Sequence, residues 1–105
     1  MMHNHAYTSM TEAIQGLKAR GFTTNFEYLN KSLCAVDTRR TFQAEELSIR
    51  EHHRFEGASD PDDESIVYAI ETNDGIRGTI VDAYGVYANS ELEAFMEKVK
   101  MREER

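Results

Sequence analysis

Alternating apolar and polar positions predict a β-hairpin in the second half of the chain. The segments 65–71 and 76–82 both alternate, and they flank Thr72-Asn73-Asp74-Gly75, whose last three residue types readily adopt turn conformations. A three-residue loop with Gly75 at positive φ pairs Glu71 with Arg77 and Tyr68 with Ile80. We favour this register over a two-residue loop because it gathers apolar residues on one face. These residues are Ile66, Tyr68, Ile70, Ile76 and Ile80.

Helical spacing of apolar residues appears near both ends of the chain. A capping-box pattern, Ser9-Met10-Thr11-Glu12, precedes apolar positions at helical spacing and predicts a helix over about 10–20 that ends at Gly21. The pattern recurs at Ser90-Glu91-Leu92-Glu93, which predicts a closing helix with Ser90 as its N-cap. The apolar stripe of that helix is Leu92, Phe95, Met96 and Val99.

Three further elements are predicted between these helices. The short runs 26–29 and 32–36 form a second hairpin that pairs Tyr28 with Leu33 and Phe26 with Ala35. A helical turn is expected at 43–46, followed by a strand over 47–56. Strict alternation along that strand places five residues on one side, with the other side facing solvent. The five are Leu47, Ile49, Glu51, His53 and Phe55.

Together these elements predict one α+β domain over 1–105, in which 1–8 form a flexible N-terminus. We expect an antiparallel sheet of about five strands, with the N-terminal and C-terminal helices packed on one face. The other face would keep four half-apolar positions and favours a homodimer that buries them. These positions are Val67, Ala69, Thr79 and Val81.

Composition narrows the classes of partner. The 105 residues carry 19 acidic against 12 basic side chains, a net charge of −7, which argues against nucleic acid because phosphate binding needs clustered Lys and Arg. No apolar stretch is long enough to span a membrane, and no signal-peptide pattern appears. The single cysteine, Cys34, fits a packing role in a reducing compartment. We therefore expect a cytoplasmic protein that binds neither membranes nor nucleic acid.

Two titratable side chains are predicted to point inward from different strands. Alternation puts His53 on the apolar side of its strand and Asp82 on the apolar face of the hairpin. They are candidate catalytic groups if they share a pocket. The alternative is that His53 is a hydrogen-bonded core histidine and Asp82 ends its strand by capping the next turn.

The segments beside the hairpin offer candidate ligands. Asp60, Asp62 and Asp63 lie in an acidic turn around Pro61, and clustered carboxylates of this kind can hold Mg²⁺, although the EF-hand pattern is absent. The alternative is a solvated turn. Arg54 before this turn and Tyr84 after the hairpin are candidate ligand-binding residues, and Tyr84 is also a candidate catalytic group.

These residues favour a small binding or protein-interaction domain with a polar site near the acidic turn and no required cofactor. The alternative is a small Mg²⁺-dependent enzyme acting on a phosphorylated metabolite, with His53 as acid or base. The sequence contains no Gly-x-Ser-x-Gly, paired-cysteine or Gly-rich phosphate motif. It therefore identifies no reaction.

Three motifs resemble a family of uncharacterised bacterial proteins of about 100 residues, and the resemblance extends from Met10 to Val99. The motifs are Arg54-Phe55-Glu56-Gly57, Ser59-Asp60-Pro61-Asp62-Asp63 and Val81-Asp82-Ala83-Tyr84-Gly85. Some members of that family carry the label phosphoribosylpyrophosphate synthetase. Such synthetases are far longer and use two α/β domains, so the resemblance implies a small single domain and assigns no catalytic residue.

Overall fold

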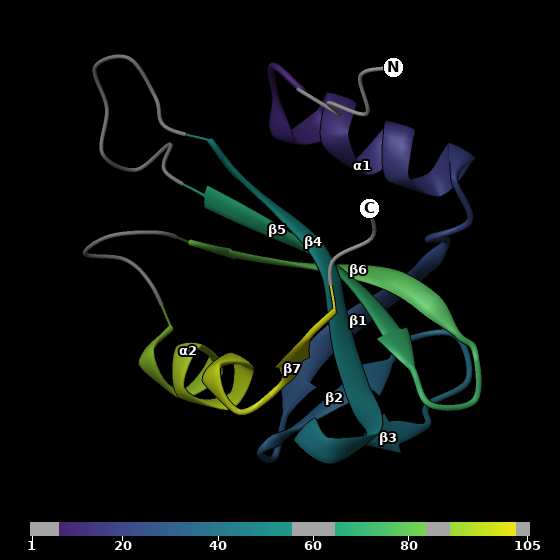
Figure 1. The fold of residues 1–105 in the computed structure, drawn as a ribbon. Coiled ribbons are helices and arrows are strands. Elements are labelled where there is room, and N and C mark those ends of the chain that lie inside the picture. The colour runs from purple at the N-terminus through teal and green to yellow at the C-terminus, as the bar shows by residue number, and fades with distance from the viewer. Residues whose placement is uncertain (1–6, 56–64, 84–88, 103–105) are drawn as a thin grey trace.

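The protein is an α+β domain in which two helices pack on a curled, mixed sheet (Figure 1). The computed structural model describes residues 7–55, 65–83 and 89–102. Within these ranges the elements are α1 (Met10–Ala19), β1 (Thr24–Leu29), β2 (Ser32–Ala35), β3 (Thr41–Phe42), the short 3₁₀ helix η1 (Ala44–Glu46), β4 (Leu47–Phe55), β5 (Ser65–Thr72), β6 (Arg77–Ala83), α2 (Ser90–Glu97) and β7 (Lys100–Met101). The sheet order is β3-β2-β1-β6-β5-β4-β7.

Both predicted hairpins are confirmed in their registers. On β5 and β6, Glu71 pairs with Arg77 and Tyr68 with Ile80, and Gly75 in the connecting loop has φ of +93°. On β1 and β2, Phe26 pairs with Ala35. Local turn chemistry and two-residue alternation therefore determine these two units.

The sheet itself differs from the predicted antiparallel sheet of about five strands. The described residues form seven strands, and β1 runs parallel to β6 while β7 runs parallel to β4. The strands β3 and β7 are each two residues long, too short to show alternation. Gly78 permits the β1–β6 contact, because a Cβ atom there would lie 2.0 Å from the Thr24 carbonyl oxygen.

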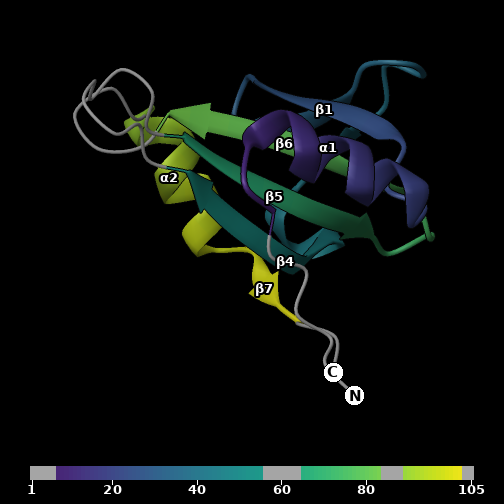
Figure 2. The same cartoon turned by 90° about the horizontal axis from the view of Figure 1, so that it is seen from above.

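The prediction that both helices lie on one face is also wrong. Leu17 of α1 packs on Val67 and Ala69 of β5, whereas α2 packs on Ile70 and other side chains of the opposite face. Figures 1 and 2 show α1 and α2 on opposite sides of β5 and β6. Val67 and Ala69 are fully buried by α1 within one chain. The half-apolar face that suggested a homodimer is therefore covered, and the dimer stays a prediction without that support.

A β-bulge interrupts the alternation predicted for β4. Ile49 pairs with Ile70 and Glu51 with Ala69, so Arg50 is an extra residue between two successive pairs. Leu47 and Ile49 consequently face α2, whereas the side chains of odd-numbered residues beyond the bulge face α1. The single side predicted for all five residues is therefore split between two faces.

The helix ends follow their predicted signals in part. The Ser9 side chain accepts a hydrogen bond of 3.1 Å from the Glu12 backbone N–H, as the first capping box predicts. At α2 the N-cap is Asn89 instead of Ser90, because the Asn89 side chain accepts from the backbone N–H groups of Glu91 and Leu92. No helix in the described ranges has the length and apolar character needed to cross a membrane.

Candidate functional site

Arg54 and Asp82, two of the predicted site residues, lie on the α2 side of the sheet. Arg54 on β4 pairs with Ile66 on β5, and Ile66 pairs with Asp82 on β6, so the three form one row across the strands. Asp82 is 8% exposed, and its Oδ1 accepts a hydrogen bond of 3.2 Å from the Asn89 backbone N–H. Asp82 thus ties the end of its strand to the start of α2, as the alternative reading proposed.

A groove next to this row is formed by β4, β5, α2 and β7, and its volume is about 450 Å³. We call it the Tyr68 groove. Its apolar walls are Ile49, Ile66, Met96, Val99 and Met101. Its polar residues are His52, Arg54, Tyr68, Glu93 and Glu97. An apolar lining with a few polar groups is typical of sites for small molecules.

Tyr68 is a half-buried residue of this groove. Burial raises the pKa of the Tyr68 phenol, and the carboxylates of Asp82 and Glu93 raise it further, whereas Arg54 has the opposite effect. The phenol is therefore protonated at neutral pH and able to donate a hydrogen bond. Carboxylates outnumber cations near Tyr68, which makes the groove a favourable environment for a positive charge.

His52 adds a second polar group to the same groove. Its ring lies 6.3 Å from the Tyr68 ring, between centroids. Its Nδ1 atom is buried and has no hydrogen-bond partner in the part of the chain that the structure describes. Because a buried nitrogen without a partner costs free energy, a ligand that bonds to it would be stabilised. Alternation had predicted a solvent-facing His52, and the bulge at Arg50 turns it toward α2.

His53, the third predicted site residue, lies on the opposite face. It pairs with Val67, and its ring packs edge to face on Tyr7 with 4.9 Å between centroids. Its Nε2 lies 2.7 Å from Oε2 of Glu51. His53 and Asp82 therefore do not meet, and they do not share the pocket on which their role as candidate catalytic groups depended.

Glu51 joins His53 to the helix α1. Arg20 donates two hydrogen bonds to the Glu51 carboxylate, of 3.0 and 2.7 Å, and a third of 3.3 Å to the Tyr7 hydroxyl. Burial raises the pKa of Glu51, but the hydrogen bonds from Arg20 and His53 outweigh burial and lower it to about 2. We call Tyr7, Arg20, Glu51 and His53 the α1 clamp. Their mutual hydrogen bonds indicate that the clamp fixes the position of the helix.

The remaining predicted site residues lie outside the described ranges. These are Tyr84 and the three carboxylates proposed to hold Mg²⁺, namely Asp60, Asp62 and Asp63. In the ranges that are described, no three His, Cys, Asp or Glu side chains come together as a metal site. The magnesium site stays a prediction.

Sequence patterns give no site role to Tyr68 or Glu93. Tyr68 falls on the apolar face of its strand, and a tyrosine at such a position needs a partner for its hydroxyl, which is the one sequence signal for a site there. Glu93 had no comparable signal, because it faces the groove only once α2 packs on β4 and β5.

Comparisons of this chain with models of protein families, with curated proteins and with solved structures found no match.

Proposed function

We propose that this protein is a binding domain for a small molecule, and that the Tyr68 groove is its site. The observation that carries the proposal is the protonated Tyr68 phenol between carboxylates in a groove with apolar walls. The described lining of this groove contains no Ser, Thr, Cys or Lys that could act as a nucleophile beside His52, so we propose binding instead of catalysis.

The residues of the groove favour a particular class of ligand. An apolar body would contact the walls, including Met96 and Met101, whose flexible side chains adapt to varied shapes. A cationic head would be attracted by Glu93 and Glu97, and Asp82 contributes further negative charge near Tyr68. We therefore propose a small amphiphilic amine as the ligand.

Three probes of similar size and different charge test this proposal. Benzylamine, benzyl alcohol and benzoate would each be titrated into the protein while amide shifts are followed by NMR. We expect affinity to fall in that order, with shifts centred on residues of the Tyr68 groove. A tighter benzoate complex at the same residues would contradict the cationic ligand.

Two substitutions separate the charge from the hydroxyl. Glu93→Gln should weaken benzylamine binding about fivefold to tenfold, roughly 1 to 1.4 kcal/mol, and leave benzyl alcohol unchanged. Tyr68→Phe should weaken the binding of benzylamine and of benzyl alcohol alike, because the benzylammonium group would donate to the phenol oxygen and the alcohol would accept from or donate to it. Glu27→Gln on β1 is the matched control, since Glu27 is exposed and outside the groove. Equal effects of Glu93→Gln and Glu27→Gln would refute the site.

A further inference from the structure

A second groove lies around Lys98, at the end of α2. Two adjoining hollows of about 600 and 540 Å³ share three lining residues, Ala44, Glu45 and Lys98. The hollows therefore form one continuous surface, which we call the Lys98 groove. It is separate from the Tyr68 groove, because the two have no lining residue in common.

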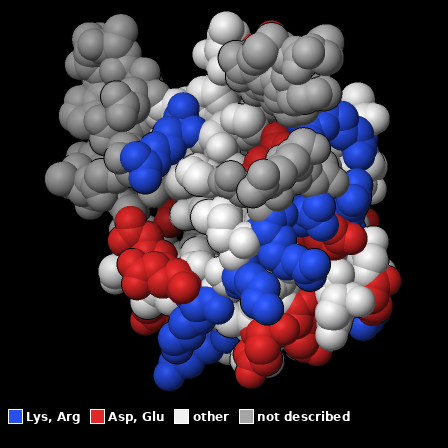
Figure 3. All heavy atoms as spheres, in the orientation of Figure 1, with Lys and Arg blue, Asp and Glu red and all other residues white. Residues whose placement is uncertain are grey.

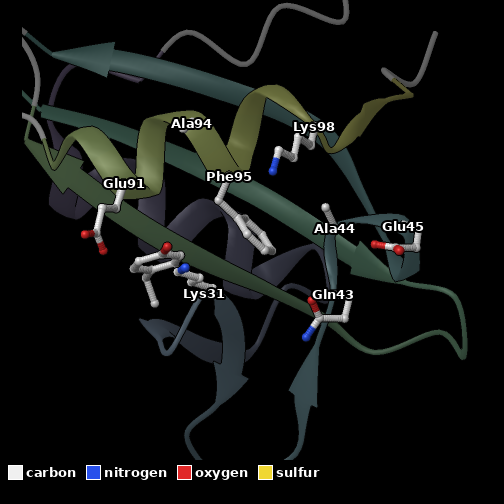
Figure 4. A pocket seen from close by; sticks show the side chains of 9 residues that line it. Lys31, Gln43, Ala44, Glu45, Glu91, Ala94, Phe95 and Lys98 are labelled. Carbon is white, nitrogen blue, oxygen red and sulfur yellow. The ribbon is translucent and has the colours of Figure 1, made fainter.

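One half of the Lys98 groove is aromatic. The rings of Tyr28 and Phe95 lie 5.7 Å apart between centroids, at an angle of 65°. Figure 4 shows Phe95 pointing from α2 into the hollow, with Lys98 one helical turn further along and Glu91 at the other end. Tyr28 is partly exposed and lines the hollow, so a planar ligand there could contact its ring.

The other half is basic. Lys98, Lys100 and Arg102 line it, and Figure 3 shows Lys and Arg atoms gathered on this face of the molecule. Within 7–55, 65–83 and 89–102 these three side chains form no ion pair. They gather in a protein whose net charge is −7, where a basic cluster is unexpected.

Most carboxylates that line the basic half form ion pairs or hydrogen bonds with other residues of the protein. Glu71 lies 2.7 Å from Nη1 of Arg50 and 3.7 Å from Nε of Arg77. Oε1 of Glu46 accepts a 2.7 Å hydrogen bond from the Gln43 backbone N–H. Among the described lining residues, the cations Arg50, Lys98, Lys100 and Arg102 outnumber the carboxylates Glu45, Glu46 and Glu71 by one. Such an excess of cations favours an anionic ligand.

We propose that the Lys98 groove binds an aromatic phosphate monoester. The aromatic ring would stack beside Tyr28 in one half, and the phosphate would lie among Lys98, Lys100 and Arg102 in the other. Lys98 borders both halves, so it would contact the phosphate where that group joins the ring. Neither half alone accounts for both parts of such a ligand.

Phenyl phosphate, inorganic phosphate and phenol test this proposal at constant ionic strength. Titrations of the full-length protein followed by NMR should give a phenyl phosphate affinity at least about tenfold above that of either other probe, because only phenyl phosphate engages both halves. The affinity should fall as salt increases, since the phosphate contacts are ionic. A phenyl phosphate complex no tighter than that of inorganic phosphate would overturn the proposal.

Matched variants assign the two halves. Lys98→Gln should lower the affinity for phenyl phosphate at least about tenfold. Lys18→Gln, on the exposed side of α1, should leave that affinity unchanged. Tyr28→Leu, which keeps an apolar contact with the core, should weaken phenyl phosphate but not inorganic phosphate. Equal results for Lys98→Gln and Lys18→Gln would overturn the site. Tyr68→Phe should leave phenyl phosphate binding unchanged, which separates this result from that for the Tyr68 groove.

Discussion

Gly78 lies where β1 and β6 run side by side, and the neighbouring strand leaves no room there for a side chain. A Cβ atom at Gly78 would lie 2.0 Å from the Thr24 carbonyl oxygen and 2.8 Å from the Phe26 ring. The Thr24 contact is with backbone, so the strands would have to separate to relieve it. A glycine within a strand is otherwise unfavourable, and the close approach of β1 explains why glycine is the second residue of β6.

We therefore expect Gly78→Ala to lower the free energy of unfolding by about 1 to 3 kcal/mol, the usual cost of overpacking. Urea denaturation followed by circular dichroism measures this. Val81→Ala in the same strand is the control. Val81 is 40% exposed, so its truncation should lower the free energy of unfolding by less. A Gly78→Ala variant as stable as the native chain would contradict the close approach of β1 and β6.

At the scale of elements, the α1 clamp links the first helix to β4. Arg20, the residue directly after α1, donates two hydrogen bonds to the Glu51 carboxylate. The same carboxylate is hydrogen-bonded to the His53 ring. The side chains of Glu51 and His53 are 18% and 19% exposed, so water screens these charges only in part. The clamp is thus expected to stabilise the packing of α1.

The pKa of Glu51 makes this stabilisation dependent on pH. Because the folded pKa is about 2, below the ordinary 4.5, the contribution is complete above pH 4.5 and declines as the pH falls toward 2. Glu51→Gln should cost on the order of 1 to 3 kcal/mol at pH 7. In urea denaturation, the difference in the free energy of unfolding between this variant and the native chain should become smaller as the pH falls from 4.5 to 2. A difference that stays constant over that range, as expected for an uncharged packing defect, would contradict the ionic clamp.

The elements also show which features the sequence could predict. The turn at Gly75 and the alternation of β5 predicted a hairpin register that is confirmed, because both signals are local. The bulge at Arg50 had no signal, since arginine is an ordinary strand residue. That single extra residue moved His52 and Arg54 to the α2 side and separated His53 from Asp82. Alternation predicted Arg54 on the solvent-facing side and His53 on the side of Asp82. In the structure Arg54 shares the row of Asp82, and His53 lies on the opposite face.

At the scale of the whole molecule, α1 occupies the face that suggested a homodimer. Apolar residues on both sides of β5 fit a strand covered on both faces within one chain, and they fit equally a strand with one core face and one dimer interface. The parallel β1–β6 pairing was not predictable, because it joins segments far apart in the chain through only two residue pairs.

The covered face leads to a prediction about association. Val81 is the exposed remainder of the four half-apolar positions. We expect Val81→Asp to leave the mass measured by light scattering unchanged at all concentrations, because any dimer would use another surface. A lower mass for Val81→Asp than for the native chain would show that this face forms an interface despite α1. Lys18→Gln is the control for a change of one charge.

The parallel pairing of β1 with β6 also has a consequence for synthesis on the ribosome. Thr24 of β1 pairs with Gly78 of β6. In a nascent chain whose β6 has not yet left the ribosome, this edge of β1 is therefore unpaired. The local contacts of β1 and β2 can form early, whereas closure of the curled sheet waits for most of the protein to emerge. The first third of the chain is therefore made well before the strand that completes it.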